Sequence, residues 1–299
     1  ITHTGDYAGG FIGWYNWDNH TLDLTMTNCL CKGTYNGNGT FHPIGVKKSG
    51  YSIDTSKCHD CYYTTNPHNN PGSNRYVYAG TKVSELTIGT TGVSIASGSY
   101  ATFQGTKYYY GTITLGYNGP MATTNFSLDG THLNDNSFTI STDNAAFDDG
   151  TATIKWDFPG RGTVEDPYQI SSAAVWDFLA DQVNGGTNYS GKYFQQTGDF
   201  TVSSKIIGYP TDDTHYVTFN GIYDGDGCTI TASISKSDER YVAPFHCIAN
   251  ATIKNVIVTG SVTVSGSASI EHRRHPAGLV GVTDGTCILQ NCRVSANVS

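Results

Sequence analysis

The sequence repeats itself, and the repeat restricts the folds that the chain can adopt. An apolar strand, an asparagine, an apolar or cysteine residue and a second strand recur in Ala251–Val262, Cys287–Val298 and Leu24–Tyr35. Asn291 follows Asn255 by 36 residues, and Asn28 follows Asn291 by 36 if the count runs on from residue 299 to residue 1. In a fainter fourth copy, Asp60 follows Asn28 by 32 residues. Strand-rich repeats of this length predict a solenoid, here a parallel β-helix.

A second motif has a similar spacing and the same wrapped order. It reads PFHC at Pro244–Cys247, AGLVG at Ala277–Gly281 and GGFIG at Gly9–Gly13. Ala277 follows Ala243 by 34 residues, and Gly9 follows Ala277 by 31 when the count runs on. Three copies of one motif could share a spacing by chance, but here two separate motifs recur at similar spacings and in the same order. We therefore expect that Ile1 cuts through a continuous β-helix, in a chain that is either processed or part of something longer.

Composition fits a fold made of many short strands. Charged residues are 14% of the chain, and there are 35 glycines, which favours strands joined by turns over long helices. The net charge of −8 argues against a general nucleic-acid or anionic-membrane binder, and no apolar run is long enough to span a membrane. One helix is predicted at 171–184, where Val175, Trp176, Leu179 and Val183 recur at helical spacing after a serine N-cap.

Two Pro/Gly-rich breaks divide the chain. We predict that 1–66 is the C-terminal part of a β-helix, which completes a neighbouring unit, and that 67–74 is a linker. Residues 75–158 are predicted to form a small antiparallel β-sandwich or barrel-like domain, and 161–299 the N-terminal, capped part of a β-helix. In the middle domain, Trp156 and the tyrosines at 108–110 are expected to fill or flank the core, although a carbohydrate-stacking face is an alternative.

The chain resembles the GLUG-motif repeats of bacterial cell-surface proteins. The resemblance rests on GLVG at 278–281, GFIG at 10–13, FNGIYDGDGCTI at Phe219–Ile230 and RGTVEDPYQISSAAVWDFLADQVN at 161–184. It covers 161–299 and then 1–66, and the middle domain resembles the small β domains between such repeats more weakly. APFHC and the insert IEHRRHP at Ile270–Pro276 depart from the pattern. The resemblance implies an extracellular β-helix, and it implies no single activity.

The two ends of the predicted β-helix differ. The helix at 171–184 is expected to cover one end, whereas no helix, proline or charge cluster covers the strand edge after Asn297. An uncovered edge invites pairing, and solenoid repeats need stacked neighbours. We therefore predict a head-to-tail or tandem-repeat filament. A monomeric fragment is the alternative. The predicted unit–unit junction comprises Cys287, Asn291, Cys292, Val294, Val298, Ile1, Phe11, Ile12, Leu24, Asn28 and Cys29.

The cysteines allow several interpretations. Cys29 and Cys31 with Cys58 and Cys61 have the spacing of a zinc site. The repeat instead makes Cys292, Cys29 and Cys61 equivalent, so they are expected to stack as buried thiols. A Cys292–Cys29 disulfide across the junction is the alternative, since neighbouring rungs lie ~4.8 Å apart.

Other residues give weaker signals. The best candidates for catalysis are Glu271, His272, Arg273, Arg274 and His275, which could neutralise a uronate and abstract a proton but also fit a solvated loop. Asp224-Gly225-Asp226-Gly227 reads as a turn rather than a calcium loop. We expect no metal and no cofactor. Sequons that could carry N-linked glycans begin at Asn19, Asn38, Asn125, Asn188, Asn250 and Asn297.

Together these features predict a structural, adhesive protein of the extracellular surface rather than an enzyme. Its expected partners are copies of itself, and glycans or a host surface. The alternative is a polysaccharide-active β-helix enzyme, a lyase or hydrolase, or a carbohydrate-binding module. A cleft lined by several carboxylates, or by Arg and Lys with calcium, would favour the alternative.

Overall fold

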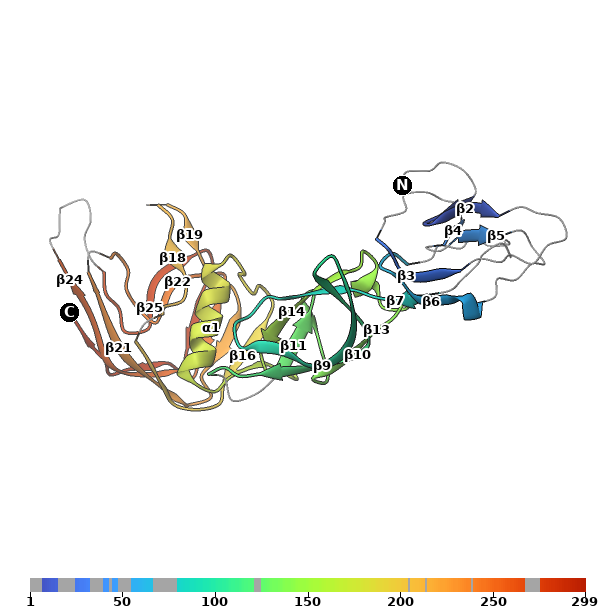
Figure 1. Cartoon of the computed structure of the whole chain (residues 1–299). Helices are drawn as coiled ribbons and strands as arrows, with labels where there is room; N and C mark the ends of the chain where they lie inside the picture. The colour runs from blue at the N-terminus through green and yellow to red at the C-terminus, as the bar shows by residue number, and fades with distance from the viewer. Residues whose placement is uncertain are drawn as a thin grey trace. The chain divides into compact units, whose positions relative to one another are not determined.

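The computed structural model describes residues 7–15, 25–32, 40–42, 45–47, 55–66, 80–120, 125–203, 205–212, 214–237, 239–266 and 275–299. The chain divides into two compact units (Figure 1). The N-terminal unit comprises Ile1–Gly119 and Thr124–Asp157, and the C-terminal unit comprises Phe158–Ser299 with Pro120–Thr123. Within the described residues the chain is mostly β-strand with one α-helix, which confirms the predicted all-β class. None of the helical structure described there has the length and apolar character needed to cross a membrane.

The first part of the N-terminal unit contains short parallel pairings. β1 (Tyr7–Gly9) pairs with β4 (Thr40–His42), and β2 (Ile12–Tyr15) pairs with β5 (Gly45–Lys47). A three-stranded parallel sheet contains β3 (Met26–Cys31), β6 (Cys58–Tyr63) and β7 (Thr81–Lys82), and a 3₁₀ turn covers Thr55–Lys57.

The second part of the N-terminal unit holds two longer sheets. One is antiparallel and contains β13 (Ser137–Ile140), β10 (Thr106–Tyr117) and β9 (Val93–Phe103). The other contains β12 (Thr131–His132), β11 (Asn125–Leu128), β14 (Thr151–Asp157) and β8 (Glu85–Ile88), with β14 and β8 parallel; a 3₁₀ turn covers Ala145–Phe147. Trp156 and Tyr108 are buried in this part, in agreement with the predicted core role.

The C-terminal unit is built from parallel sheets. The first contains β15 (Tyr168–Ile170), β16 (Tyr193–Gln196), β20 (Ile222–Asp224), β23 (Thr252–Lys254) and β26 (Ile288–Gln290). The second contains β17 (Phe200–Val202), β21 (Thr229–Ser237), β24 (Ile257–Ser265) and β27 (Arg293–Val294), with β28 (Asn297–Val298) also on β24. A third pair is β22 (Phe245–Ala249) with β25 (Val280–Asp284), and β18 (Tyr209–Pro210) forms an antiparallel hairpin with β19 (Tyr216–Val217).

The helix forms where the apolar spacing predicts it. α1 runs from Ala173 to Asn184, and the Ser172 hydroxyl caps it by accepting a hydrogen bond from the Val175 amide at 3.4 Å. The four apolar residues that set the prediction are fully buried. The Trp176 ring meets the Phe245 ring at 5.0 Å between centroids, so α1 packs on the core of its own unit (Figure 1).

The repeat alignment matches the observed strand register. Ile253 lies opposite Leu289, a step of 36 residues, and Cys29 lies opposite Cys61, a step of 32. The aligned residues also share one backbone conformation: Asn255, Asn291, Asn28 and Asp60 have φ angles of 55°, 53°, 53° and 52°. Asn and Asp tolerate this left-handed region better than most residues. They therefore recur where the chain turns a corner between two strands.

The spacing predicted for the second motif is wrong by one residue. Phe245 pairs with Val280 and Cys247 with Val282, a step of 35 rather than 34, so His246 lies opposite Gly281. A Cβ on Gly281 would lie 1.8 Å from the Tyr241 carbonyl oxygen. Only glycine permits this close approach, and the approach sets the register of β22 and β25.

Candidate functional site

Apolar ladders run through the parallel sheets of the C-terminal unit, and the first ends in an exposed residue. Phe194, Tyr223 and Ile253 occupy successive paired positions on β16, β20 and β23, and all three are buried. The next paired position, on β26, is Leu289, which is 52% exposed. The buried interior therefore continues up to β26 and then faces solvent.

Two ladders in the second sheet end in the same way. Ile230 and Val258 are buried, and the following residue, Val294, is 48% exposed. Val262 is buried, and its partner Val298 is 43% exposed. An edge of parallel strands with apolar side chains and unpaired backbone groups is a typical site for pairing with another strand. We name Ile288–Val298 the open edge.

Polar side chains line the corner beside this edge. The Asn291 side-chain amide donates to Asn255 Oδ1 at 3.3 Å, and the Asn255 amide donates to Asp224 Oδ1 at 2.8 Å. Burial would raise the pKa of Asp224, but the hydrogen bonds from Asn255 and the Asp226 amide and the nearby Lys254 ammonium hold it below its usual value. The corner forms a ladder that another asparagine could extend.

The β3–β6 pair of the N-terminal unit carries the same corner. Cys61 Sγ lies 3.6 Å from the Met26 carbonyl oxygen of the preceding strand and 3.4 Å from the His59 oxygen of its own strand. In the C-terminal unit, Cys292 Sγ lies 3.5 Å from the Ile253 oxygen and 3.4 Å from the Gln290 oxygen. Cys61 and Cys292 therefore occupy equivalent positions relative to the β3–β6 and β23–β26 strand pairs.

The predicted junction residues are only partly covered by the structure. Those of the open edge and its corner are Cys287, Asn291, Cys292, Val294 and Val298, and Asn28 and Cys29 lie on β3. Phe11 is exposed. Ile1 and Leu24 lie outside the described residues, and Ile12 is placed only as a residue of β2. All eight cysteines are free thiols.

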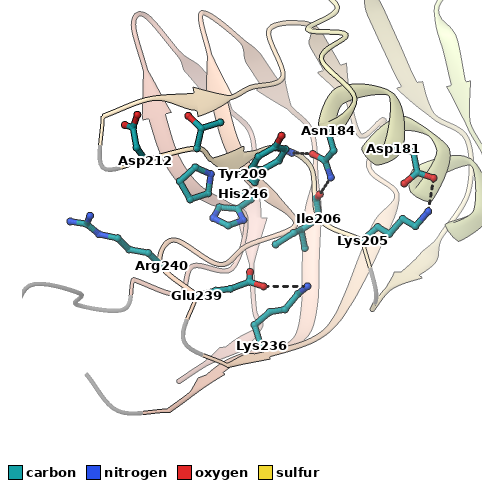
Figure 2. A pocket seen from close by; sticks show the side chains of 13 residues that line it. Asp181, Asn184, Lys205, Ile206, Tyr209, Asp212, Lys236, Glu239, Arg240 and His246 are labelled. Atoms are coloured by element: carbon teal, nitrogen blue, oxygen red, sulfur yellow. Dashed lines mark hydrogen bonds and ion pairs between the residues drawn. The ribbon is translucent and has the colours of Figure 1, made fainter. Parts of the chain in front are cut away.

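A pocket of about 740 Å³ lies between α1, the β18–β19 hairpin and β22 (Figure 2). It is lined by Asp181, Asn184, Lys205, Ile206, Gly208, Tyr209, Pro210, Thr211, Asp212, Lys236, Glu239, Arg240 and His246. Its volume lies in the usual range of small-molecule sites, about 300–1,000 Å³. It is the second candidate site of the chain.

The pocket wall is fixed to the end of the helix. The Asn184 side-chain amide donates to the Ile206 carbonyl at 3.1 Å, and Asn184 Oδ1 accepts from the Gly208 amide at 2.9 Å. Gly208 has a φ of 82°, and a Cβ there would lie 2.6 Å from the Val217 oxygen. The segment before β18 is therefore held in place by a side chain and by a glycine.

Four charged side chains of the pocket form two ion pairs. Lys205 Nζ is 2.5 Å from Asp181 Oδ2, and Lys236 Nζ is 3.6 Å from Glu239 Oε1 (Figure 2). The Asp212 carboxylate accepts backbone hydrogen bonds from Thr214 and His215, which hold its pKa far below the usual range. The lining thus presents donors and acceptors with little net charge.

His246 is the unusual residue of this lining. Side chains alternate along a strand, so Phe245 faces the core beside Trp176, whereas His246 faces the pocket. His246 is 2% exposed, and neither ring nitrogen has a hydrogen-bond partner among the described residues. Burial, and to a smaller extent the Lys236 ammonium, lower the pKa of His246 to about 4. The imidazole is therefore neutral near pH 7.

The structure describes one of the five residues of the predicted catalytic cluster, His275. Glu271, His272, Arg273 and Arg274 lie outside the described residues. His275 stacks on Tyr241, with ring centroids 5.5 Å apart. This contact places His275 beside Tyr241, and Arg240 stacks on Tyr241 as well, at 4.9 Å from its ring centroid.

The sequons lie in different settings. Asn188, Asn250 and Asn297 are exposed, and Asn125 is half-buried in β11; Asn19 and Asn38 lie outside the described residues. Asn250 Oδ1 accepts a hydrogen bond from the Thr286 amide at 3.1 Å.

The pocket was not predicted from the sequence, although one departure from the repeat marks its place. APFHC departs from the Gly-rich motif, and the register places His246 opposite Gly281. A histidine in place of the glycine marks a position where the side chain lines a pocket instead of only preserving the repeat.

Comparisons with known proteins add one partial match. Halomucin of Haloquadratum walsbyi (strain DSM 16790 / HBSQ001) is 28% identical to this chain in an alignment 187 residues long that covers 51% of the chain. The chain spans about 2% of that protein's length. No protein-family model matches the chain, and no solved structure gives a significant match.

Proposed function

We propose that this chain is a structural, adhesive protein of the extracellular surface that forms one unit of a head-to-tail or tandem filament. In this proposal the C-terminal unit is a parallel β-helix, and residues 1–66 of the adjacent unit complete it. The single observation that carries the proposal is the open edge. Three buried apolar ladders end there in Leu289, Val294 and Val298, each about half exposed.

The β3–β6 pair offers a matching surface. In the aligned repeats, Met26 is equivalent to Leu289 and Ile253, and Met26 is buried against Cys61. If β3 of one unit lies beside β26 of another, Met26 extends the first apolar ladder and Asn28 extends the amide ladder. The Cys29 thiol then lies beside the Leu289 carbonyl, as Cys292 lies beside Ile253.

Two further arguments favour a surface location. The GLUG-type motifs resemble those of cell-surface proteins, and we propose membership of that group. The partial match to halomucin, whose name indicates a mucin, supports a surface protein. Glycans at exposed sequons such as Asn188 and Asn297 would be consistent with this location.

The same arrangement places Cys292 and Cys29 on neighbouring rungs, where the spacing of ~4.8 Å permits a disulfide. Mild oxidation is expected to link Cys292 to Cys29 of another unit, and Cys292→Ser removes the link. Tryptic peptides analysed by mass spectrometry identify the pair. A link that forms only between Cys29 and Cys61 of one chain would contradict this pairing.

A protein made of two full copies in tandem tests the proposal. We expect the backbone amides of Ile288–Val298 to exchange with solvent at least tenfold more slowly in the first copy than in a single chain, because they gain strand partners. Sedimentation velocity of the single chain tests the non-covalent form. Equal exchange rates in both proteins, together with a monomer at every concentration, would refute the proposal.

A further inference from the structure

We propose that the pocket at the β18–β19 hairpin binds a short, uncharged saccharide. This inference goes beyond the proposed assembly, because the pocket lies apart from the open edge and shares none of its residues. It rests on three independent features of the lining: a buried imidazole without partners, carboxylates in ion pairs, and an exposed apolar face.

The first feature is His246. A buried polar group without a hydrogen-bond partner destabilises the free protein, and the ring of His246 has two such nitrogens among the described residues. A neutral imidazole has one donor and one acceptor, and a hydroxyl group can satisfy either. A small turn about the Cβ–Cγ bond would present a nitrogen to a ligand hydroxyl in the pocket.

The second feature is the balance of charge. Asp181 pairs with Lys205, and Glu239 pairs with Lys236. To bind Lys205 or Lys236, a carboxylate or phosphate ligand would have to displace Asp181 or Glu239, and it would meet their like charges. A sugar hydroxyl can donate to a carboxylate and accept from an ammonium at the same time, so it leaves both ion pairs intact.

The third feature is an apolar surface at the rim. Tyr209 is 40% exposed (Figure 2), and the half-buried Pro210 follows it in the lining. Aromatic rings supply a flat apolar face with a polar edge. The C–H side of a sugar ring can pack on such a face. The hydroxyls of the sugar then point toward the charged pairs and His246.

Saturation-transfer NMR and calorimetry on the full chain test this inference. The probes are four neutral disaccharides (maltose, cellobiose, lactose and chitobiose), with glucuronate and inorganic phosphate as charged probes. We expect at least one neutral disaccharide to bind and both charged probes to bind more weakly. Binding of no neutral disaccharide, or tighter binding of glucuronate or phosphate, would overturn the proposal.

Two variants locate the site. His246→Phe removes both ring nitrogens in a similar volume; we expect affinity to fall by about tenfold while the unfolding temperature holds or rises. If His246 had a purely structural role, the substitution would lower the unfolding temperature. Tyr209→Ala is expected to weaken binding about fivefold, whereas the control Tyr100→Ala, at a residue 47% exposed in the N-terminal unit, leaves it unchanged. Equal effects of both alanine variants would contradict the site.

Discussion

A charge on the open edge should block assembly without unfolding the chain. Leu289→Asp places a carboxylate where the first apolar ladder ends, and Leu289 is already 52% exposed. Burying a whole leucine contributes about 1.5–3 kcal/mol, so covering the exposed half contributes about 1 kcal/mol at the junction. An unpaired carboxylate buried there costs a further several kcal/mol. We expect a loss of about 4 kcal/mol, or roughly a thousandfold in dissociation constant.

Sedimentation velocity across a concentration series measures this effect. Val164→Asp is the matched control, because Val164 is also an exposed apolar residue but lies before β15, away from the open edge. The wild type and Val164→Asp are expected to form larger species, and Leu289→Asp is expected to remain a monomer with nearly unchanged thermal unfolding. Association of Leu289→Asp at the wild-type level, or equal weakening by Val164→Asp, would refute the reasoning.

Three further predictions concern stability. Asn255→Ala should lower the free energy of unfolding by about 2–3 kcal/mol, because alanine is strained in the left-handed conformation and the hydrogen bond to Asp224 is lost. Asn255→Gly should lower it by about 1 kcal/mol less than Asn255→Ala does. A urea titration in which the glycine variant is the less stable of the two would contradict this. Burial lowers the pKa of His246 to about 4, so the unfolded chain binds more protons than the folded chain as pH falls from about 6.5 to 4. The free energy of unfolding should therefore drop by up to about 3 kcal/mol over this range. The His246→Phe variant should lack that drop, and a pH profile identical to that of the wild type would contradict this role of His246. Burial also lowers the pKa of Lys82 to about 8, so stability should rise between about pH 8 and 10.5 by up to about 3 kcal/mol, and a Lys82→Met variant that keeps this rise in denaturant titrations would rule out Lys82 as its source.

Local signals predicted the elements that depend on local chemistry. The helical spacing and Ser172 determine where α1 forms, and the aligned Asn255 and Asn291 mark corners because a left-handed backbone selects Asn. These features are readable because each depends on a few neighbouring residues. The mostly-β class follows in the same way from the strand and turn residues.

Features that depend on distant contacts could not be predicted. The one-residue shift of the second motif results from the approach of Gly281 to the Tyr241 carbonyl, and the two residues are 40 positions apart in the sequence. The pocket requires Asn184, Tyr209 and His246 to meet, and no spacing rule connects them. The departure of APFHC from the Gly-rich motif was visible in the sequence, but only the observed register places His246 opposite Gly281.

The most direct test is the crystal structure of two full copies joined in tandem. We predict that β3 of the second copy lies parallel to β26 of the first, with Met26 opposite Leu289 at a Cα separation of ~4.8 Å. Asn28 should then continue the ladder of Asn255 and Asn291. A structure in which Ile288–Val298 remains exposed, or is covered by any other segment, would contradict the account.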